Sequence, residues 1–217
     1  MDRHDIQLTI HQISDILLMN GGFLNNPGLY TGEMGLVLFF ARYARYTQND
    51  LYLEYAYDLM GKIQDRIHLE TPINYKQGLT GIGSAIEYLV QNDFFEADTD
   101  EILEDFDKRI FFTYNFSYLS IDKIIDIGYY AAWRLSGNSA QKEMIRKTIL
   151  PKIENCSDIA ALHQKTVPDN LKVKTSKNDF WSKDMGLKNG LSGWGLSLLT
   201  ELDGDNSWFS LLPNDLK

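Results

Sequence analysis

The stretch Gly190-Leu191-Ser192-Gly193-Trp194-Gly195 decides the predicted fold, because two similar stretches occur earlier in the chain. They are Gly28-Leu29-Tyr30-Thr31-Gly32-Glu33-Met34-Gly35 and Gly78-Leu79-Thr80-Gly81-Ile82-Gly83. A degenerate copy, Asp126-Ile127-Gly128-Tyr129-Tyr130-Ala131-Ala132, precedes the last one. Gly28 and Gly78 are 50 residues apart, and each copy opens an apolar run. A motif that recurs at a period of about 20–50 residues is typical of stacked supersecondary units, so the sequence predicts repeated helix pairs.

The glycines of the three clear copies are predicted to have a structural role. Glycine lets backbones approach closely, and the first N–H groups of a helix have no partner within it. A glycine at a helix start therefore leaves room for a neighbouring helix or a ligand. The predicted structural glycines are Gly28, Gly32, Gly35, Gly78, Gly81, Gly83, Gly190, Gly193 and Gly195.

Composition limits the class of protein. The chain has 217 residues, of which 44% are hydrophobic and 24% charged, as in a typical globular protein. The formal net charge of −9 argues against nucleic acid or an anionic membrane as a partner. The single cysteine, Cys156, allows no internal disulfide, which suits a reducing compartment. With no signal peptide or transmembrane span apparent, we expect a cytoplasmic protein.

Two kinds of helix alternate in the sequence. Apolar residues at helical spacing predict outer, amphipathic helices over 6–19, 49–67, 99–112 and 139–150. Segments that are apolar on nearly every side, as in buried helices, predict inner helices over 32–46, 83–92, 121–135 and 193–202. Asn49 is a predicted N-cap, and Asp98 with Glu101 a predicted capping box. Residues 163–189 are polar and predicted to form a long loop.

No segment predicts a convincing strand, so the expected fold class is all-α. Repeated antiparallel helix pairs form either an open solenoid or a closed toroid. Inner helices that are apolar all round favour helical hairpins arranged as a partial α/α toroid. We expect residues 1–217 to form a single helical domain.

The glycine motifs at the heads of the inner helices resemble those of the lanthionine synthetase C-like family. The likeness is greatest over Asn189-Gly190-Leu191-Ser192-Gly193-Trp194-Gly195-Leu196 and extends from about Leu29 to Leu202. The resemblance implies a double-ring toroid and a cyclase that adds a peptide thiol to a dehydrated serine or threonine. It also implies a zinc ion, held by two cysteines and one histidine, which activates that thiol as a thiolate.

The sequence departs from the family where that chemistry would occur. The family's zinc site includes a Cys-His-Gly triplet, which is missing here, and Cys156 is followed by Ser157. The family fold also has more helix pairs than the four predicted here. We therefore predict no metal site, no cofactor and no thioether cyclisation by this chain alone.

Three carboxylates are expected near the starts of inner helices: Glu33, Glu87 and Asp126. If those ends line one mouth of a toroid, a pair of carboxylates could serve glycoside hydrolysis. Alternatively, the three residues are capping groups or charges that favour a helix N-terminus. Tyr30, Tyr75, Trp133 and Trp194 flank the same starts and could stack on a peptide or sugar, or lie in the core. The candidate mouth-lining residues are Tyr30, Glu33, Glu87, Asp126 and Trp194.

The remaining chemistry-bearing residues form no pattern. His4, His11, His68 and His163 are scattered, and none has a second histidine or cysteine at metal-ligand spacing. No catalytic residue and no oligomeric state follows from the sequence.

Two functional hypotheses remain. The first is a lanthionine synthetase C-like protein in peptide modification or peptide binding, whose partner is a precursor peptide or a modifying enzyme. The alternative is a carbohydrate-active, glycosidase-like α/α toroid protein.

Overall fold

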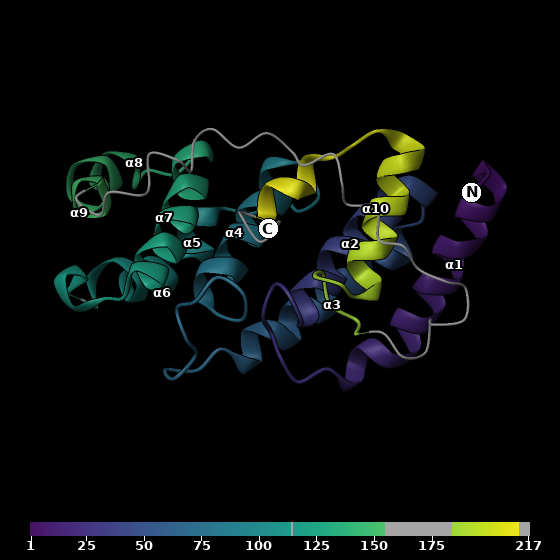
Figure 1. Ribbon diagram of the computed structural model, residues 1–217, viewed down its shortest axis with the longest axis horizontal. Coiled ribbons are helices and arrows are strands. Elements are labelled where there is room, and N and C mark those ends of the chain that lie inside the picture. Colours follow the sequence, from purple (N-terminus) through teal and green to yellow (C-terminus); the bar gives the residue numbers. More distant parts are fainter. Residues whose placement is uncertain (114, 155–183, 213–217) are drawn as a thin grey trace. The chain divides into compact units, whose positions relative to one another are not determined.

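The computed structural model describes residues 1–113, 115–154 and 184–212, and these are helical without any strand (Figure 1). The predicted all-α class is therefore confirmed. The chain divides into two compact units. Of the described residues, 1–70 and 184–207 belong to unit 1, and 71–113, 115–154 and 208–212 belong to unit 2.

Unit 1 is built around helix α2, which is buried on nearly every side. Its helices are α1 (Arg3–Asn20), the short 3₁₀ helix η1 (Gly21–Phe23), α2 (Glu33–Thr47), α3 (Asp50–Arg66) and α10 (Leu191–Asp203). Helix α2 packs against α3 and α10, and α10 also packs against α1 (Figure 1). All residues of α2 from Glu33 to Ala44 are buried, because apolar side chains point in every direction around it. This matches the inner helix that the sequence predicted.

The outer helices of unit 1 begin at side-chain caps. The Asn49 side chain accepts a hydrogen bond from the Leu51 backbone N–H at 3.1 Å, which confirms the predicted N-cap of α3. The Asp2 side chain accepts in the same way from the Asp5 N–H at 2.8 Å, so α1 starts earlier than predicted. Each cap satisfies one of the N–H groups that a helix start leaves without a partner.

Unit 2 contains shorter elements around α4 and α7. They are α4 (Leu79–Gln91), α5 (Thr99–Ile102), α6 (Glu104–Asp107), the π-helical turn η2 (Lys108–Phe112), η3 (Phe116–Tyr118), α7 (Ile121–Ser136), α8 (Lys142–Met144), the π-helical turn η4 (Ile145–Ile149) and α9 (Leu150–Glu154). The last 3₁₀ helix, η7 (Ser207–Leu211), carries the buried side chains of Trp208 and Leu211.

Two predicted outer helices of unit 2 are interrupted in the structure. The single helix expected over 99–112 is interrupted at Leu103, whose φ of −98° and ψ of 8° are not helical. Asp98 caps α5 through the Asp100 N–H at 2.9 Å. The helix expected over 139–150 is divided into α8, η4 and the start of α9. Pro151 is the second residue of α9 and has no N–H to donate, so it interrupts the hydrogen bonds of a helical run that continues from η4 into α9.

Helix α7 is less enclosed than the sequence predicted. Only one stripe of it is buried, formed by Ile124, Ile127, Tyr130, Ala131 and Arg134. The degenerate glycine motif lies inside α7, which starts after Ser120 rather than at a glycine. The sequence from 121 to 135 looked apolar overall, but Asp122 and Lys123 are exposed and Asp126 is half-buried.

Candidate functional site

The helices α2, α4 and α10 share one mode of initiation, a loop folded back over the helix start. We call residues 26–32, 72–78 and 184–190 the lead-in loops. In each, the first helical N–H donates to the carbonyl seven residues earlier. Glu33 N–H bonds Asn26 O at 2.8 Å, Leu79 N–H bonds Pro72 O at 2.9 Å, and Leu191 N–H bonds Asp184 O at 2.7 Å. The lead-in loop thus supplies an acceptor that the helix itself cannot offer.

Each lead-in loop ends in the N-cap glycine, namely Gly32, Gly78 or Gly190. Their φ values of −116°, −124° and −106° are ordinary extended values, so glycine is not needed for backbone conformation. It is needed for space, because a Cβ would collide with backbone carbonyl oxygens of the same loop in all three cases. The loops can therefore fold back only when the cap residue has no side chain.

The geometry changes the alignment of the copies. In sequence, Gly28-Leu29 matches Gly78-Leu79, but in space the counterpart of Gly78 is Gly32. The corresponding separation is 46 residues instead of 50. Gly28 instead lies within the first lead-in loop, where its N–H bonds the Asn26 side chain at 2.8 Å. The pattern common to the three starts is thus glycine, two residues, glycine.

Hydroxyl side chains reinforce two of these loops. Thr80 Oγ1 donates to Ile73 O at 2.6 Å, and Ser192 Oγ donates to Met185 O at 2.5 Å. Both residues are the second of their helix and both acceptors lie seven residues earlier. The first copy has Met34 at this place, so it lacks this bond.

The two lead-in loops of unit 1 lie against each other. The Lys188 backbone N–H donates to Tyr30 O at 2.9 Å. A Cβ on Gly186 would lie 2.5 Å from Thr31 Cα, and one on Gly35 would lie 2.7 Å from Leu187 N. In both α2 and α10, the glycine three residues after the cap faces Leu187. Close backbone contact between the loops thus brings the starts of α2 and α10 together.

Three of the candidate mouth-lining residues, Tyr30, Glu33 and Trp194, belong to this part of unit 1, and all three are buried. The Lys188 Nζ lies 5.5 Å from the centre of the Tyr30 ring. Glu33 Oε1 forms an ion pair with Arg66 Nη1 at 2.5 Å, while the same nitrogen donates to Leu24 O at 2.6 Å.

The Glu33 carboxyl is held away from water. Burial raises its pKa above the usual value, although the neighbouring cations Arg66 and Lys62 act to lower it. Within the described residues, neither carboxylate oxygen has a hydrogen bond of good geometry, in spite of the ion pair. Glu33 is therefore a poorly solvated carboxylate whose ion-pair partner, Arg66, is partly exposed.

The other two candidates, Glu87 and Asp126, lie in unit 2. Asp126 is half-buried on α7, and its charge is one of the factors that raise the pKa of buried Tyr75, after burial itself. The Tyr75 ring lies 5.4 Å from that of Tyr129. Glu87 is in the third turn of α4 instead of at its start, and it is fully buried.

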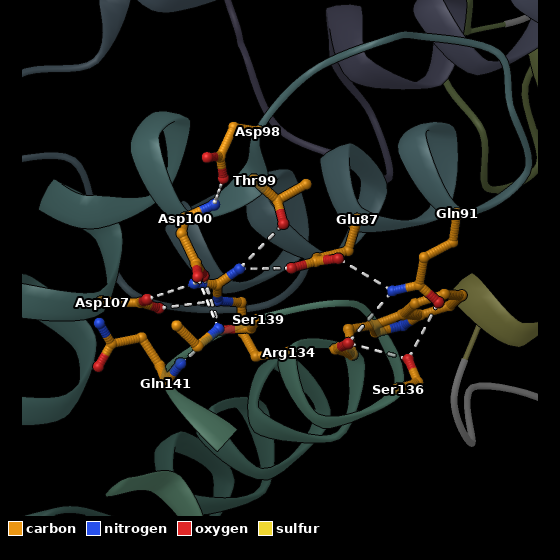
Figure 2. Close-up of polar contacts among 12 residues, drawn as sticks. Glu87, Gln91, Asp98, Thr99, Asp100, Asp107, Arg134, Ser136, Ser139 and Gln141 are labelled. Carbon is orange, nitrogen blue, oxygen red and sulfur yellow. Dashed lines mark hydrogen bonds and ion pairs between the residues drawn. The ribbon is translucent and has the colours of Figure 1, made fainter. Parts of the chain in front are cut away.

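Glu87 belongs to an ion cluster centred on Arg134 (Figure 2). The Arg134 guanidinium reaches Glu87 Oε1 at 2.6 Å, Asp107 Oδ2 at 2.7 Å and Asp100 Oδ1 at 2.6 Å. It also donates to Thr99 Oγ1 at 3.3 Å. One cation thereby links α4, α5, α6 and α7.

Further hydrogen bonds hold the carboxylates of this Arg134 cluster. Asp100 accepts from Ser139 Oγ and from the Ala140 N–H, both at 2.6 Å. Gln91 Nε2 donates to Glu87 Oε2 at 2.9 Å (Figure 2). The Tyr130 hydroxyl donates to Asp107 Oδ1 at 2.6 Å. Buried charges are stable only when they are paired and hydrogen-bonded in this way.

The pKa values of the two aspartates, Asp100 and Asp107, are shifted in opposite directions by their surroundings. Burial raises the pKa of Asp107, in opposition to the lowering effect of Arg134 and Tyr130. Burial also acts to raise the pKa of Asp100, but hydrogen bonds from Ser139, Ala140 and Arg134 outweigh it and lower that pKa. Burial opposes the Arg134 charge as well, yet its carboxylate partners raise its pKa, so the guanidinium stays charged.

Sequence reasoning missed Arg134 and its two aspartate partners. The available signal was that Arg134 continues the apolar stripe of α7 at the spacing Ile127, Ala131, Arg134. A charge on a buried stripe requires a countercharge. The amphipathic pattern over 99–112 instead predicts an outer helix, with Asp107 on its solvated face.

A metal site is not seen in the described residues, which contain no group of three or more His, Cys, Asp or Glu able to hold an ion. Cys156 and His163 lie outside the described residues. His11 is exposed and lies 3.9 Å from Asp15. In the parts of the chain that the structure covers, no helix has both the length and the apolarity needed to cross a membrane.

Comparison with protein-family models, with curated proteins and with solved structures found no match for this chain.

Proposed function

We propose that the chain is a lanthionine synthetase C-like protein that acts in peptide modification by binding a peptide, without a zinc cyclase site of its own. Its helical hairpins would form a partial α/α toroid. The natural partner would be a precursor peptide or an enzyme that modifies one.

One observation carries the proposal. The three glycine motifs that resemble the family's motifs are also the three helix starts with the same folded-back lead-in loop. Because equal spacing of hydrogen bonds accompanies the shared pattern of glycine, two residues, glycine, it supports a repeated structural unit over chance similarity among glycine-rich turns.

The proposed binding region is the surface around the two lead-in loops of unit 1. Tyr30, Glu33 and Trp194 are buried beneath it, so contact with a peptide would fall to more exposed neighbours. Thr31 and Asn189 are exposed, and Lys188 is half-buried.

A peptide that carries one cysteine and one dehydroalanine tests both parts of the proposal. Addition of the thiol to the double bond leaves the mass unchanged, so cyclisation is measured as loss of alkylatable thiol. We expect the chain to bind the labelled peptide in an anisotropy titration. We also expect the thiol to disappear no faster with the chain than without it, and no stoichiometric zinc in elemental analysis.

Matched variants locate the binding. Lys188→Ala removes the side chain above Tyr30 and should weaken binding about tenfold, equivalent to about 1.4 kcal/mol. Lys123→Ala, an exposed lysine on α7, should leave it unchanged. Absence of any binding contradicts the peptide-binding role, and zinc-dependent acceleration of thiol loss contradicts the absence of a cyclase site.

The carbohydrate alternative has less support from the geometry. A glycosidase needs two carboxyl groups facing one substrate, a few ångströms apart. Glu33 and Glu87 are each buried in an ion pair with an arginine. We therefore retain the peptide-binding proposal.

A further inference from the structure

The sequence contains two Asn-Gly pairs, Asn20-Gly21 and Asn189-Gly190. Such a pair is chemically reactive, because the glycine nitrogen can attack the asparagine side-chain carbonyl without hindrance from a Cβ. Whether it reacts in a folded protein depends on how firmly the two groups are held.

The two pairs lie in opposite environments. Asn20 is the half-buried last residue of α1, where its Nδ2 donates to Ile16 O at 2.8 Å and the Gly21 N–H bonds Leu17 O. Asn189 is exposed and lies outside any helix, with a left-handed φ of 58°. Among the described residues, no hydrogen bond holds its side chain or the Gly190 N–H.

We propose that Asn189 is a site of spontaneous deamidation. The Gly190 nitrogen loses its proton and forms a bond to Cγ of Asn189, and the Cγ–Nδ2 bond breaks to release ammonia. Water then opens the resulting cyclic imide at either carbonyl, which yields aspartate or isoaspartate. The net change consumes one water and releases one ammonia, and it requires no other reactant.

The position makes the two products different in effect. Lys188 and Leu191, on either side of the pair, are tied by backbone hydrogen bonds to Tyr30 and Asp184. Isoaspartate lengthens the backbone between these two ties and therefore disturbs the lead-in loop of α10. Aspartate keeps the backbone length and adds a negative charge next to the N-terminus of α10, where the helix dipole favours it.

The test is ageing of the purified full-length chain at mildly alkaline pH and physiological temperature. Samples are cleaved with pepsin in acid, which prevents further reaction, and each asparagine is followed by mass spectrometry and isoaspartate labelling. We expect Asn189 to convert about tenfold faster than Asn20, a difference of about 1.4 kcal/mol in activation free energy. In chain unfolded by denaturant, the two should convert at similar rates.

Two variants complete the experiment. Asn189→Gln should abolish the fast conversion, because its longer side chain forms the imide slowly. Asn189→Asp carries the product charge without the longer backbone, and its thermal midpoint should be at least that of the parent, whereas the isolated isoaspartate fraction should melt lower. Equal rates for Asn189 and Asn20 in the folded chain, or faster conversion at Asn20, would overturn the proposal.

Discussion

Both compact units contain a buried arginine that ties an inner helix to its neighbours, but they neutralise it differently. In unit 1, Arg42 of α2 bonds both carboxylate oxygens of Asp203, at 3.0 and 2.8 Å, and the Asp205 carbonyl at 2.9 Å. These aspartate side chains are 35% and 40% exposed. In unit 2, the Arg134 partners Glu87 and Asp107 are only 1% and 8% exposed.

The difference determines what happens when the cation is lost. Carboxylates at the edge of a unit can be hydrated when their partner is removed, so they lose mainly hydrogen bonds. Carboxylates in the interior cannot be hydrated when their cation is removed. The free-energy cost of burying their charge is then no longer offset. The Arg134 cluster also holds three carboxylates for one guanidinium, so it is sensitive to any further change of charge.

The largest expected effect is therefore that of Arg134→Met. We expect a loss of about 3–5 kcal/mol in the unfolding free energy of unit 2, because Glu87 and Asp107 remain buried without a countercharge. Arg42→Met should lower that of unit 1 by about 1–3 kcal/mol. Hydrogen exchange followed by mass spectrometry reports the two units separately.

A second variant covers the case in which Arg134→Met does not fold. Arg134→Lys keeps the positive charge but loses the forked set of guanidinium donors, so it should give an intermediate loss. Equal losses in the two units would break the comparison.

The second prediction concerns a feature that the units share, the lead-in loop. Gly78→Ala in unit 2 and Gly190→Ala in unit 1 each place a Cβ against backbone oxygens, so we expect losses of about 1–3 kcal/mol in both. The matched control is Gly61→Ala in the interior of α3, where a Cβ meets nothing within 4 Å. It should stabilise by about 0.5–1 kcal/mol through better helix propensity. Chemical denaturation of the three variants measures this, and a neutral Gly78→Ala would contradict the folded-back loop.

The third prediction uses pH within the Arg134 cluster. The pKa of Asp100 is lowered in the folded state, so its ionised form stabilises the fold above the usual pKa, and that stability is lost as pH falls through the folded value. Asp100→Asn should cost about 1–2 kcal/mol at neutral pH and little in acid. The pKa of Asp107 is raised, so its contribution runs the other way: it is present in acid and lost as pH rises through the folded value.

Asp107→Asn should accordingly remove the loss of stability that the parent chain shows as pH rises through the folded pKa of Asp107. Denaturation at a series of pH values distinguishes the two variants. If both substitutions change the pH dependence of the unfolding free energy in the same direction, the assignment of opposite roles to Asp100 and Asp107 is wrong.

The smallest expected effect is at the ion pair between Arg42 and Asp205. Asp205→Asn removes one partly exposed carboxylate 3.4 Å from Arg42 but leaves the Asp205 carbonyl in place. We expect a loss below about 1 kcal/mol that shrinks further in high salt, because exposed ion pairs are weak and screened. The Arg134 cluster variants should lose the same stability at all salt concentrations, which denaturation at low and high salt will check.

Much of the helical layout could be predicted from side-chain periodicity. Continuous apolar runs marked α2, α4 and α10 as buried, since a helix without a polar face must be enclosed. Apolar stripes at helical spacing marked α1 and α3 as outer helices, and Asn49 marked the start of α3. These features depend on residues within a few turns of each other, so a local pattern contains the information.

The lead-in loops show where local patterns lose accuracy. The repeated glycines were visible, yet the sequence match paired Gly28 with Gly78 although the structural counterpart is Gly32. At each N-cap, a Cβ would collide with the backbone carbonyl oxygens four and six residues earlier, so only glycine fits. A sequence alignment cannot detect this collision. The interruption of the helix expected over 99–112 at Leu103 likewise has no clear signal in the sequence.

The Arg134 cluster was decided by tertiary structure alone. Its charges come from residues 87, 100, 107 and 134, which are brought together only when α4, α5, α6 and α7 pack. In the sequence Asp100 and Asp107 look like any solvated acidic residues, and Glu87 looked like a group near a helix start. Their roles depend on burial and on one distant cation, because the energy of a charge in a protein is determined by its surroundings in space and not by its neighbours along the chain.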